Sequence, residues 1–214
     1  MFDYAHVPWV SKRQKLIDKP ALPDDIARFT LATLAALLFV DAGLTPIEIH
    51  HFARSGDALD VVFHTGRLRR SFQEYTADTC PTLIGLRASS ISRFPAGYVQ
   101  NAPATAAYIQ RIGAGEFAGS RGYALSEDDT LRARAIELLM CNFQLDLSVS
   151  ELEFGPRAGI LISAFEDIAE KFSPFVTWDS HRLKIVPEGR SLTRMIAAAF
   201  DQHMPDRLTY SRAT

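Results

Sequence analysis

The sequence predicts a mixed α/β fold, in which the last strands and helices of a βα-repeating sheet or barrel precede a mainly helical, winged-helix-like part. Two observations predict it. Residues 24–92 alternate between helical and strand patterns, whereas the residues after about 120 carry helical patterns interrupted by one hairpin pattern. We therefore expect two domains, residues 1–120 and 121–214. With 214 residues, 47% of them hydrophobic, the chain can bury one sizeable core or two small ones.

The first part begins with the most apolar helical pattern in the sequence. Asp24 or Asp25 can cap a helix that continues to about Asp41, and Gly43 can end it. The apolar side chains of this pattern occupy more than one face of a helix. We therefore expect other elements to cover this helix on most sides.

Two strands and a second helix are expected next. Ile47 and Ile49 alternate with polar residues and predict a short strand, and Asp57 can begin a helix. The run 83–92 is apolar, contains small residues and lies between two prolines, which fits a buried strand.

The remaining elements are predicted from apolar spacing and from capping signals. Ser126 and Asp129 resemble a capping box at the start of a helix. The expected elements are helices within 104–112, 126–141, 158–172 and 192–200, and a hairpin over 175–186.

The composition argues against nucleic-acid and membrane partners. Lys and Arg number 23 and Asp and Glu number 25, so no strong field attracts nucleic acid or an anionic membrane. The most apolar segment, 29–40, is shorter than the roughly 20 residues that a membrane-spanning helix needs. The first ten residues lack the pattern of a secretory leader, so we expect a cytoplasmic location.

No metal site is predicted from the cysteines and histidines. Cys80 and Cys141 are far apart in the sequence and cannot form a zinc or iron–sulfur site by themselves, although their number would allow one disulfide. His50 and His51 are adjacent, so in a strand they point in opposite directions and cannot form a ligand pair on one face.

Four segments carry a resemblance to a known family. They are FDYAHVP at 2–8, HHFAR through RRSFQEYT at 50–76, GLRASSIS ending at Ser92 and followed by GYVQN at 97–101, and RGYALSEDD through CNFQLD at 121–146. In order and spacing they resemble the oxygen-independent coproporphyrinogen III oxidases, which are radical S-adenosylmethionine enzymes, along nearly the whole chain.

The resemblance implies a fold and a reaction. The family has an incomplete α/β barrel followed by a largely helical domain, and it converts coproporphyrinogen III to protoporphyrinogen IX by oxidative decarboxylation of two propionates. A CxxxCxxC loop holds a [4Fe–4S] cluster that cleaves S-adenosylmethionine. The family pattern places these cysteines upstream of every segment matched here. The resemblance therefore implies that this chain alone forms no radical, and that a separate N-terminal radical S-adenosylmethionine chain is a candidate partner.

The resemblance also implies site residues. By matching positions, Ala5 and Ile91 would line the S-adenosylmethionine site, and Gln73 would face the active-site cavity. An arginine can bind a carboxylate through two parallel hydrogen bonds, so Arg70, beside Arg69, is a candidate contact to substrate propionates. No residue of this chain is assigned a catalytic role, and whether the chain is an active enzyme is left open.

Two positions depart from the family pattern. The family usually has glycine where Arg87 and Glu74 stand. A glycine at position 87 would let the backbone approach a cofactor closely, whereas arginine adds a long charged side chain there.

Two alternatives stay open at this point. The chain could be a non-catalytic haem- or tetrapyrrole-binding protein, with Tyr4, His6, His50 or His51 as axial ligands. A winged-helix transcription factor would need a basic recognition helix, but the last helical pattern contains only Arg194.

Overall fold

The computed structural model of the chain describes residues 6–9, 12–48, 50–71 and 74–203. Its α-helices are α1 (Asp25–Asp41), α2 (Ala58–His64), α3 (Thr105–Gly113), α4 (Glu127–Asn142), α5 (Leu147–Phe154), α6 (Leu161–Lys171) and α7 (Thr193–Ala198). Its strands are β1 (Leu44–Glu48), β2 (His51–Arg54), β3 (Arg69–Arg70), β4 (Tyr75–Thr76), β5 (Ile91–Phe94), β6 (Gly97–Asn101), β7 (Gly119–Ala124), β8 (Gln144–Asp146), β9 (Val176–Trp178) and β10 (Arg182–Ile185). Short 3₁₀ helices cover Lys12–Leu16, Lys19–Ala21, Gly155–Ile160 and Pro187–Leu192.

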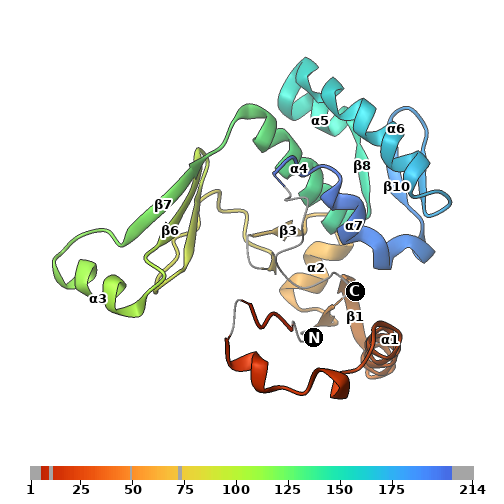
Figure 1. Ribbon diagram of the computed structural model, residues 1–214. Helices are drawn as coiled ribbons and strands as arrows, with labels where there is room; N and C mark the ends of the chain where they lie inside the picture. Colours follow the sequence, from red (N-terminus) through yellow and green to blue (C-terminus); the bar gives the residue numbers. More distant parts are fainter. Residues whose placement is uncertain (1–5, 10–11, 49, 72–73, 204–214) are drawn as a thin grey trace.

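The chain forms a helical body from which an arm projects (Figure 1). In the body, α4 to α7 surround an antiparallel sheet with the strand order β8-β10-β9. The arm is the antiparallel sheet β5-β6-β7, with α3 at its far end. The hairpin β1–β2 and α2 lie between the body and α1. The short pair β3–β4 contacts α4 and so joins this region to the body.

The main core lies in the body. Phe165 of α6 has its ring centroid 4.8 Å from that of Trp178 and 5.8 Å from that of Phe200, both in edge-on geometry. Leu139 and Leu183 are fully buried in the same cluster. Aromatic pairs of this kind contribute to stability beyond the area that they bury, so this cluster is the part of the fold most sensitive to substitution.

The predicted capping box at the start of α4 is confirmed. The Ser126 hydroxyl accepts from the backbone N–H of Asp129 at 3.1 Å, and the Asp129 carboxylate accepts from the backbone N–H of Ser126 at 2.9 Å. Nε2 of His203 lies 2.6 Å from the same carboxylate. Hydrogen bonds from His203 and Ser126 hold the pKa of Asp129 below its usual range.

The predicted mixture of helices and strands is confirmed. Each predicted helix corresponds to one of α1, α2, α3, α4, α6 or α7, and the predicted hairpin is β9–β10. Every strand pair among the described residues is antiparallel, and β7, which crosses the predicted boundary at residue 120, pairs with β6. The incomplete barrel, the winged-helix arrangement and the two domains stay predictions.

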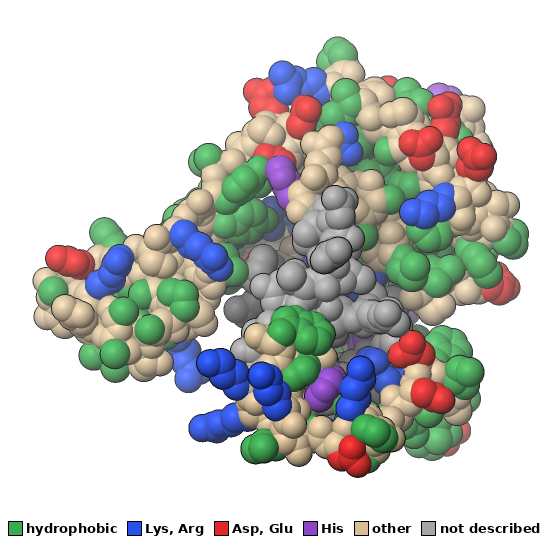
Figure 2. Space-filling view, in the orientation of Figure 1, with side chains coloured by type: hydrophobic (Ala, Val, Ile, Leu, Met, Phe, Trp, Pro, Cys, Tyr) green, Lys and Arg blue, Asp and Glu red, His purple; other side chains and the backbone are tan. Residues whose placement is uncertain are grey.

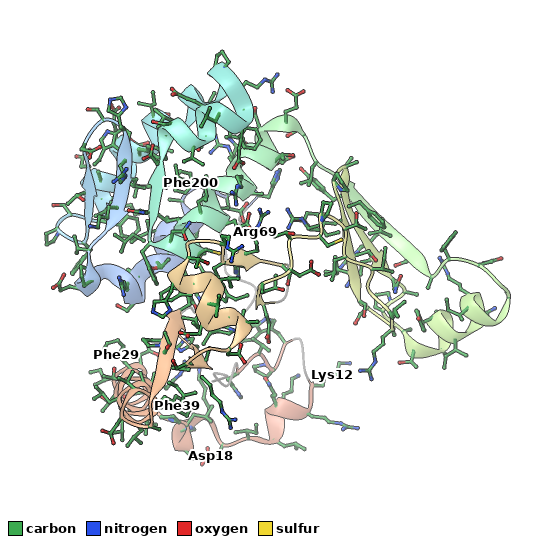
Figure 3. The ribbon with its side chains drawn as sticks, turned by 180° about the vertical axis from the view of Figure 1, so that it is seen from behind. Lys12, Asp18, Phe29, Phe39, Arg69 and Phe200 are labelled. Carbon is green, nitrogen blue, oxygen red and sulfur yellow. The ribbon has the colours of Figure 1, made fainter. Side chains whose placement is uncertain are left out.

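The expectation that α1 is covered on most sides is wrong for the described part of the chain. None of its residues is buried, although Phe39 packs against Phe52 with the ring centroids 4.9 Å apart. Phe29 and Phe39 lie on this helix at the edge of the molecule (Figure 3). Its exposed large apolar side chains are Ile26, Phe29, Leu31, Leu34, Leu37, Leu38, Phe39 and Val40. Among the elements described, the helix makes its most numerous contacts with β1. Not one of the helices described is long and apolar enough to cross a membrane.

The core predicts a large difference between two phenylalanines. Phe165 is 0% exposed and Phe117 is 99% exposed. Phe165→Ala should lower the free energy of unfolding by about 3–5 kcal/mol, because it leaves a cavity among packed side chains. Phe117→Ala should change it by less than about 0.5 kcal/mol. Urea unfolding followed by circular dichroism measures both, and equal losses would show that the core lies elsewhere.

Candidate functional site

Ile91, predicted to contact S-adenosylmethionine, begins β5 at the edge of a cavity in the arm. This cavity has a volume of about 750 Å³. The loop 83–90 and Ile91 line one side of it, and Thr105, Tyr108 and Ile109 line the other side from α3 and its start. Polar and apolar residues line this space, and Ile91 is partly exposed. Apolar area combined with backbone hydrogen-bonding groups is the chemistry that binds a purine.

Side chains from β5 and β6 hold the loop in place. Nδ2 of Asn101 donates to the carbonyl of Gly85 at 2.8 Å and to that of Arg87 at 3.0 Å. Oγ of Ser92 accepts from the backbone N–H of Gly85 at 3.0 Å. The hydroxyl of Tyr108 accepts from the backbone N–H of Arg87 at 3.2 Å. The polar ends of the GLRASSIS and GYVQN segments therefore fasten the loop that carries Ile91.

The prediction of a buried strand over 83–92 is wrong, and the backbone gives the reason. The strand begins only at Ile91, and the side chains of Ile84 and Leu86 are exposed. Arg87 has φ +123° and Ser89 has φ +58°, which turn the chain out of the extended conformation. A Cβ at Gly85 would lie 2.9 Å from the carbonyl oxygen of Ile91, so only glycine fits there.

Arg87 occupies a conformation that glycine prefers. The family that this sequence resembles usually has glycine at this position, and φ +123° is a conformation in which an L side chain is strained. The departure noted in the sequence therefore coincides with a strained residue at the cavity that Ile91 also lines.

Arg69 and Arg70 lie in β3, where Glu137 of α4 fixes them. One carboxylate oxygen of Glu137 accepts from Nε of Arg69 at 2.9 Å and from the backbone N–H of Arg70 at 3.1 Å. The other oxygen accepts from Nη1 of Arg134 at 2.7 Å. Figure 3 shows Arg69 in the middle of the molecule, between the body and the arm. The Arg70 guanidinium lies 5.9 Å from the ring centroid of Tyr75. The other two predicted site residues, Ala5 and Gln73, lie outside the described residues.

A second polar cluster surrounds Glu48, the last residue of β1. Its carboxylate is 0% exposed, with Nδ1 of His51 at 3.5 Å and Nε of Arg194 at 4.0 Å. Burial raises the pKa of Glu48, but His51 and Arg194 outweigh it and hold the pKa below its usual value. The Tyr75 ring meets the His51 ring edge-on at 5.0 Å, and burial raises the pKa of Tyr75. This cluster ties the HHFAR segment to α7.

His50 and His51 have different surroundings. His50 is buried beside a cavity of about 410 Å³ between α1 and the body, and His51 contacts Glu48 and Tyr75. Of the other two candidate axial ligands, His6 lies among the residues that the structure describes, and Tyr4 lies outside them. Among the residues whose positions are described, no three His, Cys, Asp or Glu side chains are grouped so that they could hold a metal ion.

The two cysteines have different surroundings. Both are free; Cys80 is exposed and Cys141 is buried in α4. Burial raises the pKa of Cys141 to about 12.

Sequence reasoning missed three residues that organise the site: Glu48, Asn101 and Glu137. Asn101 ends the quoted GYVQN segment, which was the available signal. Glu137 occupies a buried position of an otherwise amphipathic helix, where a carboxylate needs a cationic partner. Nothing in the sequence indicated which arginine that partner would be.

The strain at Arg87 gives a prediction. Arg87→Gly should raise the free energy of unfolding by about 1 kcal/mol, because relief of the strained φ exceeds the entropy that glycine adds to the unfolded chain. Arg87→Ala is the matched control: it removes the charge, keeps the strain and should give no gain. Urea unfolding measures both. An equal gain in the free energy of unfolding in the two variants would show that loss of the arginine side chain, and not relief of the strained backbone, causes the effect.

The charge network gives a second prediction. Glu137→Gln should lower the free energy of unfolding by about 2–3 kcal/mol, since Arg69 and Arg134 lose the charge of a carboxylate that is only 9% exposed. Glu153, which is 38% exposed, also pairs with Arg134. Glu153→Gln is therefore the control, and it should cost less than about 1 kcal/mol. A larger cost for Glu153→Gln than for Glu137→Gln in urea unfolding would contradict the assignment.

Comparison with known proteins places this geometry in a family. A scan against models of protein families finds no match. An oxygen-independent coproporphyrinogen III oxidase of Cereibacter sphaeroides is 49% identical over 215 residues, which cover 100% of this chain and 48% of the relative. A protein of the same name from Paracoccus denitrificans is 47% identical over 94% of this chain and 45% of the relative. One from Thermostichus vulcanus is 31% identical over 100% of this chain and 67% of the relative.

A solved structure agrees with these relatives. It is described as coproporphyrinogen III oxidase (HemN) from Escherichia coli, a radical SAM enzyme, and it matches with a TM-score of 0.87 and 30% identity over 95% of this chain and 47% of its own. The chain thus spans about half the length of most of the relatives that it matches. It belongs to the oxygen-independent coproporphyrinogen III oxidase family.

Proposed function

We propose that this chain supplies one wall of the active site of an oxygen-independent coproporphyrinogen III oxidase. The reaction is the oxidative decarboxylation of two propionates of coproporphyrinogen III, which gives protoporphyrinogen IX in haem biosynthesis. The observation that carries the proposal is the loop before β5, which Asn101 and Ser92 hold so that Ile91 borders a cavity of about 750 Å³. A fastened loop beside a cavity can position a cofactor.

We assign the residues of the site as follows. Ile91 packs against S-adenosylmethionine, which supplies the adenosyl radical when it is bound and cleaved. Ala5 lines the same cofactor, and Gln73 faces the substrate cavity. The chain orients the reactive methylene and excludes water from it. Residues 1–120 belong to the α/β barrel, and residues 121–214 form the helical C-terminal domain of a cytoplasmic protein.

Radical formation needs a further stretch of polypeptide. The sequence contains no CxxxCxxC motif, and its two cysteines, Cys80 and Cys141, lie far apart in it. This further stretch can be part of the same chain or a separate N-terminal chain. The exposed apolar side chains of α1 support this helix as the surface that the further stretch covers. A helix with this composition is stable when a neighbour covers it.

Anaerobic reconstitution tests the proposal. The chain is mixed with the N-terminal half of the Cereibacter sphaeroides relative, and it is also joined to that half in one polypeptide. Both are given iron, sulfide, S-adenosylmethionine, a reductant, coproporphyrinogen III as the substrate and a one-electron acceptor that oxidises the substrate radical as carbon dioxide leaves. The fusion should form protoporphyrinogen IX, whereas the chain alone should bind no stoichiometric cluster and form no product. Activity of the chain alone would contradict the proposal that radical formation needs a further stretch of polypeptide. An inactive fusion that binds its cluster would contradict the proposed function.

A substitution tests Ile91 in the same fusion. Ile91→Ala should weaken S-adenosylmethionine binding by roughly tenfold, since it removes apolar contact area. Ile112→Ala removes the same atoms from a half-exposed position of α3 away from the cavity, and it should change the affinity by less than about twofold. Equilibrium dialysis with labelled S-adenosylmethionine measures both affinities. Equal affinities of the two variants for S-adenosylmethionine would show that Ile91 does not contact this cofactor.

A further inference from the structure

A small cationic pocket lies beside the proposed cofactor cavity. It has a volume of about 120 Å³, and Arg69, Arg70 and Arg93 line it together with Glu137, Asp78 and several threonines. Arg93 comes from β5, and Arg70 comes from β3. Two segments that are far apart in the sequence thus place guanidinium groups at one small space, which is large enough for a single small anionic group.

The carboxylates of the pocket are already engaged. Both oxygens of Glu137 accept hydrogen bonds, from Arg69 and the backbone of Arg70 on one side and from Arg134 on the other. Asp78 accepts from the backbone N–H of Cys80 at 2.8 Å. Three arginines therefore face two carboxylates in the pocket, and Arg134, which lies outside it, is also paired with Glu153. The pocket carries an excess of positive charge.

The guanidinium groups of Arg70 and Arg93 have N–H donors that a ligand could use. In the part of the chain that the structure describes, the guanidinium of Arg93 makes no hydrogen bond or ion pair, and that of Arg70 contacts only the Tyr75 ring. Both side chains are half-buried, so a carboxylate between them would be partly shielded from water. Glu137 and Tyr75 hold Arg70, and the antiparallel pairing of Leu83 with Arg93 holds β5. The backbone under both arginines is therefore anchored.

The position relative to Ile91 indicates what the pocket binds. Arg93 follows Ile91 by two residues in β5, so the two side chains project from the same face of the strand, about 7 Å apart along it. Leu83 borders both the cationic pocket and the cavity beside Ile91. An anionic group held by Arg93 would lie next to the proposed cofactor wall. The proposed substrate carries such groups, its propionates.

We infer that Arg70 and Arg93 form a carboxylate-binding site that receives one propionate of the tetrapyrrole substrate. The inference rests on the proposed function and adds a substrate-positioning site to it. Planar guanidinium groups bind carboxylates through paired hydrogen bonds, which fix orientation as well as position. A propionate held here would set the distance between the macrocycle and the cofactor wall at Ile91.

Cys80 provides a direct measurement, because it lines the pocket and is exposed, whereas Cys141 is buried. The rate of alkylation of Cys80 by iodoacetamide, a neutral reagent, is followed by mass spectrometry. A carboxylate bound beside the thiol shields it from the reagent. Alkylation of Cys141 reports any loss of the fold.

The probes are coproporphyrin III, which is a stable oxidised form with the same propionates, its uncharged tetramethyl ester, and tricarballylate.

Coproporphyrin III and tricarballylate should slow alkylation of Cys80 by roughly threefold or more, and the ester should not. Arg93→Ala and Arg70→Ala should each raise the concentration needed for protection about tenfold, which corresponds to the loss of one charge-assisted contact. Arg121→Ala is the matched control: Arg121 lies in β7 of the same arm, where its Nε donates to Gln100 at 2.6 Å outside the pocket. It should leave protection unchanged.

The outcomes separate this inference from the proposed function. Protection by coproporphyrin III that survives both substitutions would overturn the carboxylate site and leave the proposed function intact. No protection by either carboxylate would also overturn the site. Protection by tricarballylate that depends on Arg93, without protection by coproporphyrin III, would support a carboxylate site and contradict the assignment of a tetrapyrrole.

Discussion

The buried carboxylate of Glu137 joins the short pair β3–β4, which carries Arg69 and Arg70, to the body of the protein. It lies on α4, whose other side packs into the core with Leu139, and it binds the side chain of Arg69 and the backbone of Arg70. A carboxylate with so little exposure is stable only when cations and N–H groups surround it. Its three partners therefore have little freedom, and the short pair β3–β4 acquires a fixed position that two residues per strand would not give it.

The arm is organised differently, by amides and hydroxyls. Asn101 and Ser92 hold the loop before β5 through hydrogen bonds to its backbone, and they do so around a residue, Arg87, whose backbone is strained. Strain of this kind persists only where the surrounding structure over-determines it. The loop thus keeps its shape although its apolar side chains are exposed, and the shape determines which side of β5 Ile91 and Arg93 face.

The exposed face of α1 and the share of the relatives that the chain covers fit one physical picture. The body has a packed core of its own, centred on Phe165, whereas α1 offers apolar side chains that no described element covers. Figure 2 shows apolar side chains at the surface over α1, with acidic side chains next to them. A helix that is apolar on several faces belongs inside a larger assembly. The chain covers about half of the length of most of its relatives.

The sequence by itself determined the local elements and the family. The capping box at Ser126, the caps at Asp24 and Asp57 and the apolar spacing of α4, α6 and α7 depend on neighbouring residues, and the structure confirms them. The prediction over 83–92 was wrong because an apolar composition cannot show that Arg87 and Ser89 turn the chain. Only the tertiary structure decided that Glu137 meets Arg69, and that Arg70 and Arg93 share a pocket. Charged groups pair across space wherever burial makes an unpaired charge costly, and no periodicity along the chain records which partner is near.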